Sequence, residues 1–117
     1  MASRMQKLFE MPVADVYPHY VTKLESKGHT TDELHEVMRW LTGYSEAQLE
    51  ERLTDRTSFQ DFFAGATLNP NASKITGVIC GMRVEEIEDP LTQQIRYLDK
   101  LVDEVARGKA MEKVLRP

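Results

Sequence analysis

Residues 89–108, DPLTQQIRYLDKLVDEVARG, decide the fold of this 117-residue chain. Asp89 has the side chain of a helix N-cap, and Pro90 suits the first helical position, where an N–H has no partner. Gly108 can end the helix, so the sequence predicts one of about 17 residues and about 25 Å. Its apolar residues alternate spacings of four and three, the pattern of a two-heptad seam: Leu91, Ile95, Leu98, Val102 and Val105. Another surface must cover this seam.

Upstream of this stretch, cap signals predict several shorter helices. Asp15 is the predicted cap of a helix that runs to about residue 26 and stops at Gly28. Three pairs match the capping box, in which a hydroxyl and a Glu or Gln side chain satisfy each other's free amides: Thr30 with Glu33, Ser45 with Gln48, and Thr57 with Gln60. They predict helices over 32–42 and 46–54 and a third around 59–63. Residues 110–116 are expected to add one or two helical turns.

Residues 75–84, ITGVICGMRV, allow two interpretations. Their β-branched side chains favour a strand. Four apolar residues would instead share one side of a helix: Ile75, Val78, Ile79 and Met82. We favour the helix, with Asn71 as its cap, although its two interior glycines, Gly77 and Gly81, each cost about 1 kcal/mol relative to alanine.

Together these patterns predict an all-α fold. We expect a small orthogonal bundle of about five to six short helices with a long C-terminal helix, or an α+β fold if 75–84 is a strand. A chain of 117 residues is the size of one domain, and no linker, repeat or low-complexity tract divides it. Residues 1–117 are therefore interpreted as a single helical domain.

The composition limits the classes of function. The chain has 15 Lys and Arg against 19 Asp and Glu, a net charge of −4, which disfavours binding to a nucleic-acid backbone. Residues 32–54 have the outline of a helix-turn-helix. The helix that would read DNA, however, carries three acidic residues, Glu46, Glu50 and Glu51, and only one basic residue, Arg52. No apolar run has the length of a signal peptide or a membrane span, so we expect a cytoplasmic protein without a membrane partner.

The sequence shows no catalytic signature. Cys80 is the only cysteine, so no internal disulfide can form, and its apolar surroundings favour a buried core residue over a reactive thiol. The acidic run Glu85, Glu86, Glu88 and Asp89 lacks the alternating ligands and glycine of a calcium loop, which favours a solvated surface. We therefore predict no metal site, no cofactor and no catalytic residue.

Several stretches resemble a known family. They are Val16-Tyr17-Pro18, residues 40–44 (WLTGY), Leu68-Asn69-Pro70 and, above all, residues 81–91 (GMRVEEIEDPL), continued by residues 95–101 (IRYLDKL) and 108–113 (GKAMEK). Over about residues 5–116 the chain resembles the domain of unknown function 2200 family. The resemblance implies a small cytosolic bacterial protein of helical fold, with no assigned activity and no functional residues to carry over.

Two hypotheses of function follow. The first is a non-enzymatic interaction module, a homodimer or the binder of another protein, whose interface is the exposed part of the seam: Leu91, Ile95, Leu98, Leu101, Val102 and Val105. In a compact bundle the same residues would be core. The second is a small-molecule binding protein or enzyme that uses a polar cluster at the junction before the last helix: Arg83, Glu85, Glu86, Arg96, Tyr97 and Asp99. Nucleic-acid binding ranks last because of the charge.

Overall fold

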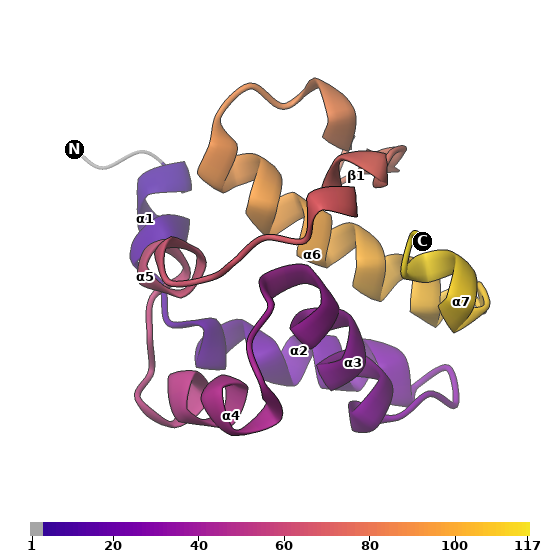
Figure 1. Ribbon diagram of the computed structural model, residues 1–117, viewed down its shortest axis with the longest axis horizontal. Coiled ribbons are helices and arrows are strands. Elements are labelled where there is room, and N and C mark those ends of the chain that lie inside the picture. The colour runs from indigo at the N-terminus through magenta and orange to yellow at the C-terminus, as the bar shows by residue number, and fades with distance from the viewer. Residues whose placement is uncertain (1–3) are drawn as a thin grey trace.

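The computed structural model describes residues 4–117, and these residues form a mainly helical globule (Figure 1). The α-helices are α1 (Arg4–Glu10), α2 (Val13–Glu25), α3 (Thr31–Thr42), α4 (Glu46–Thr54), α5 (Phe59–Ala64), α6 (Pro90–Ala106) and α7 (Met111–Val114). Between α5 and α6 lie the 3₁₀ helices η1 (Pro70–Lys74) and η2 (Val84–Glu86), with the short strands β1 (Val78–Ile79) and β2 (Met82–Arg83) between them. The predicted all-α class and long C-terminal helix are confirmed.

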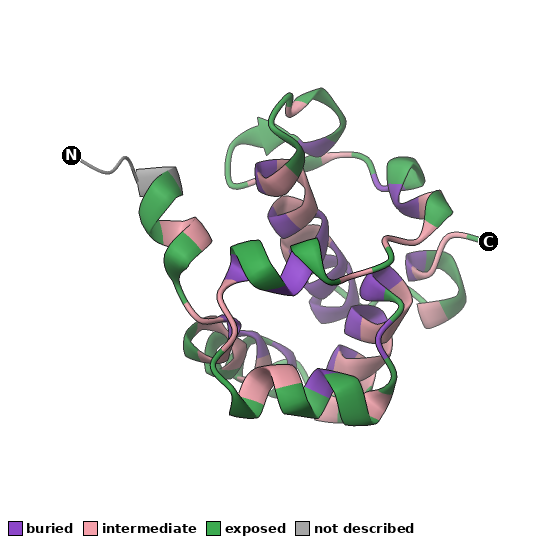
Figure 2. Cartoon of the chain, turned by 60° about the vertical axis from the view of Figure 1, so that its left-hand side comes forward, coloured by how far each residue is buried: buried purple, intermediate pink, exposed green. Residues whose placement is uncertain are grey.

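Helix α6 is the centre of the fold. It has 17 residues, its Asp89 cap accepts a hydrogen bond from the Thr92 amide, and Pro90 opens it. Helices α2, α3 and α5 pack against it, so its apolar seam is the core of the molecule. Figure 2 shows the buried positions gathered along the central helices. Among residues 4–117, no helix combines the length and the apolar composition that crossing a membrane requires.

The capping predictions have different outcomes. Both Thr30 and Ser45 form complete capping boxes, as predicted. The prediction for Thr57 is wrong, because its amide and carbonyl are bonded to the backbone of residues 52 and 13, and Ser58 caps α5 instead. Asp15 is also not a cap: α2 begins two residues earlier, and the Asp15 carboxylate pairs with Arg56 at 2.7 Å.

The favoured helix over residues 75–84 is wrong. The chain forms a hairpin in which Val78 pairs with Arg83 and Ile79 with Met82, and Asn71 lies inside η1 rather than capping a helix. Cys80 and Gly81 form the two-residue turn, with φ of 51° and 78°. Positive φ at both positions matches the twist of a tight hairpin, whereas a helix needs negative φ throughout. The strands are so short that the fold stays mainly α.

Helices α2 and α6 run side by side in the same direction. The contact of Tyr20 with Asp99 is followed one turn later by that of Lys23 with Asp103. Both helices therefore end at the same side of the molecule. Side chains of α6 hold the hairpin and η2: Lys100 Nζ donates to the Val78 carbonyl at 3.3 Å, and the Gln93 side chain donates to the Val84 carbonyl at 3.1 Å.

Candidate functional site

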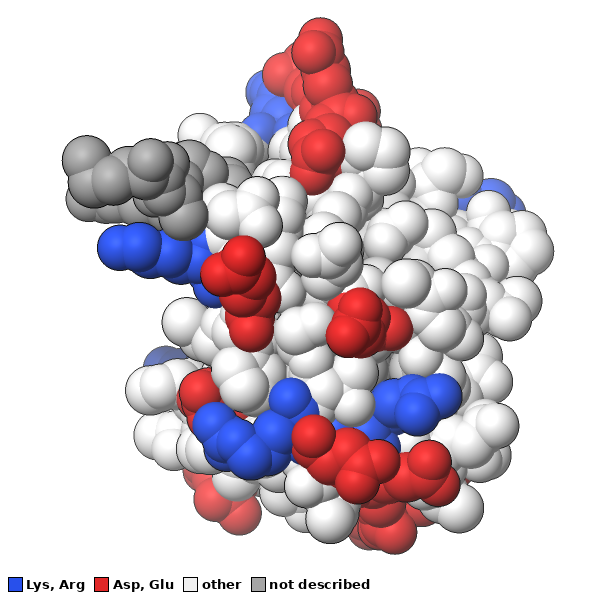
Figure 3. Space-filling model, turned by 90° about the vertical axis from the view of Figure 1, so that its left-hand side faces the viewer, with Lys and Arg blue, Asp and Glu red and all other residues white. Residues whose placement is uncertain are grey.

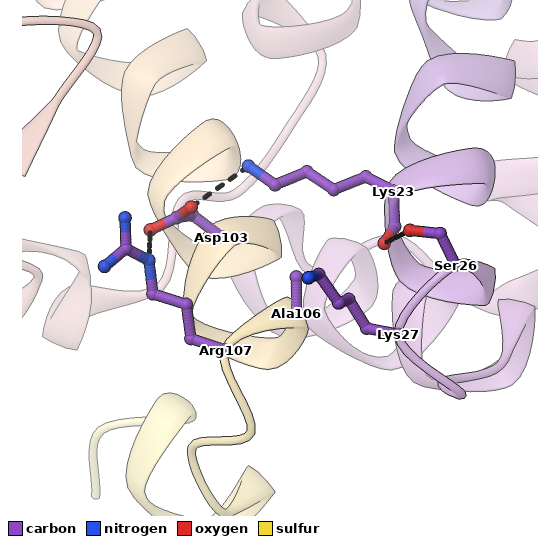
Figure 4. A pocket seen from close by; sticks show the side chains of 6 residues that line it. All are labelled: Lys23, Ser26, Lys27, Asp103, Ala106 and Arg107. Atoms are coloured by element: carbon purple, nitrogen blue, oxygen red, sulfur yellow. Dashed lines mark hydrogen bonds and ion pairs between the residues drawn. The ribbon is translucent and has the colours of Figure 1, made fainter.

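A groove between α2, α6 and the hairpin turn holds a concentration of polar side chains. It contains two neighbouring hollows, here called the upper and the lower hollow. The upper hollow has a volume of about 250 Å³ and is lined by His19, Tyr20, Lys23, Ile79, Cys80, Asp99 and Val102. The lower hollow has a volume of about 590 Å³ and is lined by Lys23, Ser26, Lys27, Asp103, Ala106 and Arg107 (Figure 4). Lys23 lines both, so the two hollows are neighbours, and together they are called the α2–α6 groove.

A fixed hydrogen-bond array forms one wall of the upper hollow. The Tyr20 hydroxyl donates to one carboxylate oxygen of Asp99 at 2.5 Å, and Arg96 Nη1 donates to the other at 2.8 Å. Burial, and then the negative charge of Asp99, hold the pKa of Tyr20 well above its usual range, so the hydroxyl keeps its proton. Within the described residues, the buried Arg96 Nε has no hydrogen-bond partner.

Cys80 lies at the mouth of the upper hollow. The thiol is exposed, which corrects the prediction of a buried core cysteine, because the hairpin turn places residue 80 at its tip. Its sulfur accepts a long contact of 3.7 Å from Arg96 Nη1. An exposed thiol beside a fixed cation is a setting in which cysteines are accessible to reagents. The apolar side chains of Ile79 and Val102 line the same hollow.

Three basic side chains and one carboxylate line the lower hollow. Asp103 receives Lys23 Nζ at 3.1 Å and Arg107 Nε at 2.9 Å. Burial raises the pKa of Asp103, but the hydrogen bonds and charges of Lys23 and Arg107 together outweigh it and bring the pKa below its ordinary value. Figure 4 shows Lys27 extending across the hollow towards Ala106, and no residue of the described chain pairs with it.

The six polar residues of the predicted ligand cluster do not meet in one place. Arg96 and Asp99 belong to the groove, but Tyr97 is buried in the core with 5% of its surface exposed. Arg83 and Glu85 pair with each other on the hairpin at 3.7 Å, where Glu85 also accepts the Gly77 amide. Arg83 and Glu86 both line a separate hollow of about 580 Å³, together with Gly81, Met82, Ile87 and Glu88.

Sequence reasoning missed most of the groove. The omitted residues are Tyr20, Lys23, Lys27, Cys80, Asp103 and Arg107. A signal for two of them was present, since Asp103 and Arg107 continue the three- and four-residue spacing of Arg96 and Asp99 along one face of α6. The matching spacing of Tyr20, Lys23 and Lys27 marks the facing side of α2 and its C-terminal turn.

The predicted interface is largely inside the molecule. Leu91 is half-buried, but five of its six residues are at most 1% exposed: Ile95, Leu98, Leu101, Val102 and Val105. Helices α2, α3 and α5 of the same chain cover them. The seam is therefore the protein's own core, which corrects the expectation that part of it is left for a partner.

A second polar network lies away from the groove. The Tyr17 hydroxyl is 2.5 Å from His35 Nε2, and His35 Nδ1 is 2.6 Å from Glu46, which also binds Arg39. This network connects α2, α3 and α4, and its groups satisfy one another. We interpret it as a set of structural contacts that hold these three helices together.

The charged side chains outside the groove are dispersed over the surface of the described residues. Within residues 4–117, His, Cys, Asp and Glu side chains form no group of three that could hold a metal ion. Figure 3 shows both signs of charge scattered over the face with α1, and acidic side chains protruding at the end of the molecule where the loop before α6 lies.

Comparisons with known proteins place the chain in a family. None of the curated proteins matches it. A crystal structure described as that of uncharacterized protein SP1917 has 45% sequence identity and a TM-score of 0.88, covering 98% of this chain and 93% of that one. The model of a family described as an uncharacterized protein conserved in bacteria matches residues 7–116. The chain therefore belongs to the domain of unknown function 2200 family (DUF2200).

Proposed function

We propose that this protein binds a small, mainly apolar molecule in the upper hollow of the α2–α6 groove. One observation carries the proposal: the hydrogen-bonded array of Tyr20, Asp99 and Arg96 lies beside a hollow that is also lined by Ile79 and Val102. Ligand sites are typically concave and largely apolar, with a few fixed polar groups that orient the ligand. The volume of about 250 Å³ is below the range of roughly 300–1,000 Å³ that is usual for such sites, so the ligand is small.

The array is suited to orientation because it is rigid. Tyr20 and Asp99 come from two packed helices, and each Asp99 oxygen is already held by one donor. A carboxylate has lone pairs for further hydrogen bonds, so Asp99 can accept one from a ligand without releasing either partner. Fixed side chains lose little conformational entropy on binding. The proposal concerns binding and includes no chemical step.

A titration followed by ¹H–¹⁵N NMR tests this proposal, with 1-naphthol as the probe. The expected result is a saturable change in the amide signals of Tyr20, Ile79 and Val102. Protein whose Cys80 carries N-ethylmaleimide is the matched comparison, because the adduct occupies the mouth of the hollow, and it should lose most of the affinity. Saturable changes confined to another surface, or none at all, would contradict the proposal.

We further propose that the protein works in the cytoplasm. An exposed cysteine without a disulfide partner in the chain suits a reducing compartment. Measuring the redox state of Cys80 in intact cells tests this: the thiol is expected to be reduced, and a mixed disulfide would contradict it.

A second candidate function is self-association through the hairpin. Val78 and Met82 are exposed apolar side chains, at 55% and 37%, and the pairing of the strands places them on opposite faces of the hairpin. Sedimentation should then show a dimer that Val78→Lys converts to a monomer. A monomeric wild-type protein at high concentration would rule this candidate out.

A further inference from the structure

We infer that the ligand of the α2–α6 groove carries a phosphate group, which the lower hollow holds through Lys27, Lys23 and Arg107. The inference rests on the proposed function, since it specifies the class of molecule that enters the same groove. The ligand would place its apolar body in the upper hollow and its phosphate one helical turn further along α2 and α6.

The charge of the lower hollow is opposite to that of the whole chain. The chain has a net charge of −4, yet the hollow is lined by three basic side chains and one acidic one. The next carboxylate on α6, Glu104, is bound by Arg116 and Lys109. The hollow therefore concentrates positive charge on an otherwise acidic protein.

Helix ends alone do not account for these cations. Helices α2 and α6 both end here, and each C-terminus is equivalent to about half a negative charge, which favours nearby basic side chains. Two such helix ends and the Asp103 carboxylate amount to about two negative charges. The side chains of Lys23, Lys27 and Arg107 carry three positive charges. About one positive charge is left over, and of the two lysines that line the hollow, Lys27 is the one whose side chain pairs with no described residue.

The geometry allows a bound anion to take over existing contacts. The side chains of Lys23 and Arg107 are 44% and 79% exposed, and that of Asp103 is 11% exposed. Because two cations bind Asp103, one of them can turn to a phosphate while the other keeps this carboxylate paired. Lysine binds phosphate as a compact charge, and the arginine fork can bind two of its oxygens.

The two hollows are close enough for one molecule to span them. Lys23 lines both, and the neighbouring residues Val102 and Asp103 line the upper and the lower hollow respectively. The two sets of lining residues therefore share Lys23 and are adjacent on α6. A small ring system with a phosphate ester attached has this shape.

Calorimetry with two matched probes tests the inference: 1-naphthol and 1-naphthyl phosphate share the ring system and differ in the charged group. We expect the phosphate ester to bind at least about tenfold more tightly. Lys27→Gln should weaken binding of the ester about fivefold, the effect of losing one exposed ion pair, and leave 1-naphthol unchanged. The control is Lys7→Gln on α1, a helix that packs against α5, and it should change neither affinity.

The outcomes separate the inference from the proposed function. Equal affinities for the two probes, or equal effects of Lys27→Gln and Lys7→Gln, would overturn the phosphate site and leave the upper hollow intact. Failure of 1-naphthol to bind would overturn the proposed function. An NMR titration with inorganic phosphate alone then decides on the lower hollow: changes at Lys27, Ala106 and Arg107 that Lys27→Gln abolishes support it, and their absence contradicts it.

Discussion

The two faces of α6 differ in how completely the protein satisfies them. The apolar face, with Leu98, Leu101 and Val105, is covered by α2, α3 and α5 and has no surface left to offer. The polar face also meets α2, through Asp99 and Asp103, but leaves two hollows beside those contacts. The first face explains why the chain folds, and the second is where a ligand can act.

The largest expected effect comes from breaking the apolar face. Leu98→Ala removes a fully buried side chain, and the lost burial and the cavity together should lower the free energy of unfolding by about 3 kcal/mol. Leu98→Met keeps the volume and should cost less than about 1.5 kcal/mol. Urea unfolding measures both. A loss below 1 kcal/mol for the alanine variant would mean that the seam is not the core.

A smaller effect is expected on the polar face from Tyr20→Phe. The change removes a hydrogen bond to a charged acceptor, which should cost about 2 kcal/mol of unfolding free energy. Tyr44→Phe is the matched control, because the buried Tyr44 hydroxyl donates to the neutral Phe62 carbonyl at 2.7 Å, and it should cost about 1 kcal/mol. The reverse order of the two losses would show that the Tyr20–Asp99 contact does not hold the groove together.

The Asp103 contacts predict a dependence on pH. The pKa of Asp103 is lower in the folded protein, so its stabilising effect is fully present above the unfolded-state pKa of about 3.9 and is lost as the pH falls through the folded-state value. Asp103→Asn should therefore cost about 1 kcal/mol at pH 6, and the difference from wild type should shrink below pH 4. Urea unfolding across this range measures it, and a difference independent of pH would contradict the ion pairs.

The smallest effect concerns the turn that closes the upper hollow. Cys80 has a positive φ, which asparagine tolerates and β-branched residues do not. Cys80→Asn should raise the free energy of unfolding by about 0.5 kcal/mol, whereas Cys80→Val should lower it by about 1 kcal/mol. Thermal unfolding compares the two variants. Equal stabilities would mean that the turn is not held in this conformation.

Local signals predicted the regular part of the fold well. The Thr30 and Ser45 capping boxes and the Asp89-Pro90 start of α6 were readable because each depends on residues within one helical turn. The hairpin at residues 78–83 could not be predicted in the same way, because the spacing of its apolar residues fits a helix equally well. The two glycines were the better signal, because both adopt positive φ in the structure.

The groove was harder to predict because it depends on residues far apart in the sequence. Tyr20 and Asp99 are 79 positions apart, and they meet only because α2 and α6 run in the same direction. Arg96 and Asp99 were identified from their own helix, whereas the spacing of Lys23 and Lys27 places them on one side of α2 and its C-terminal turn without indicating that this side faces α6. Cys80 was assigned to the core on its apolar neighbours, and the turn exposed it instead.

Co-crystallisation with 1-naphthyl phosphate tests the central claim, that the polar face of α6 is a ligand site, most directly. The account predicts density for the ring system against Ile79 and Val102, with the phosphate within hydrogen-bonding distance of Lys27. Density for the ligand on another surface, such as the hollow beside Met82 and Ile87, or an empty groove in crystals soaked to saturation, would contradict it.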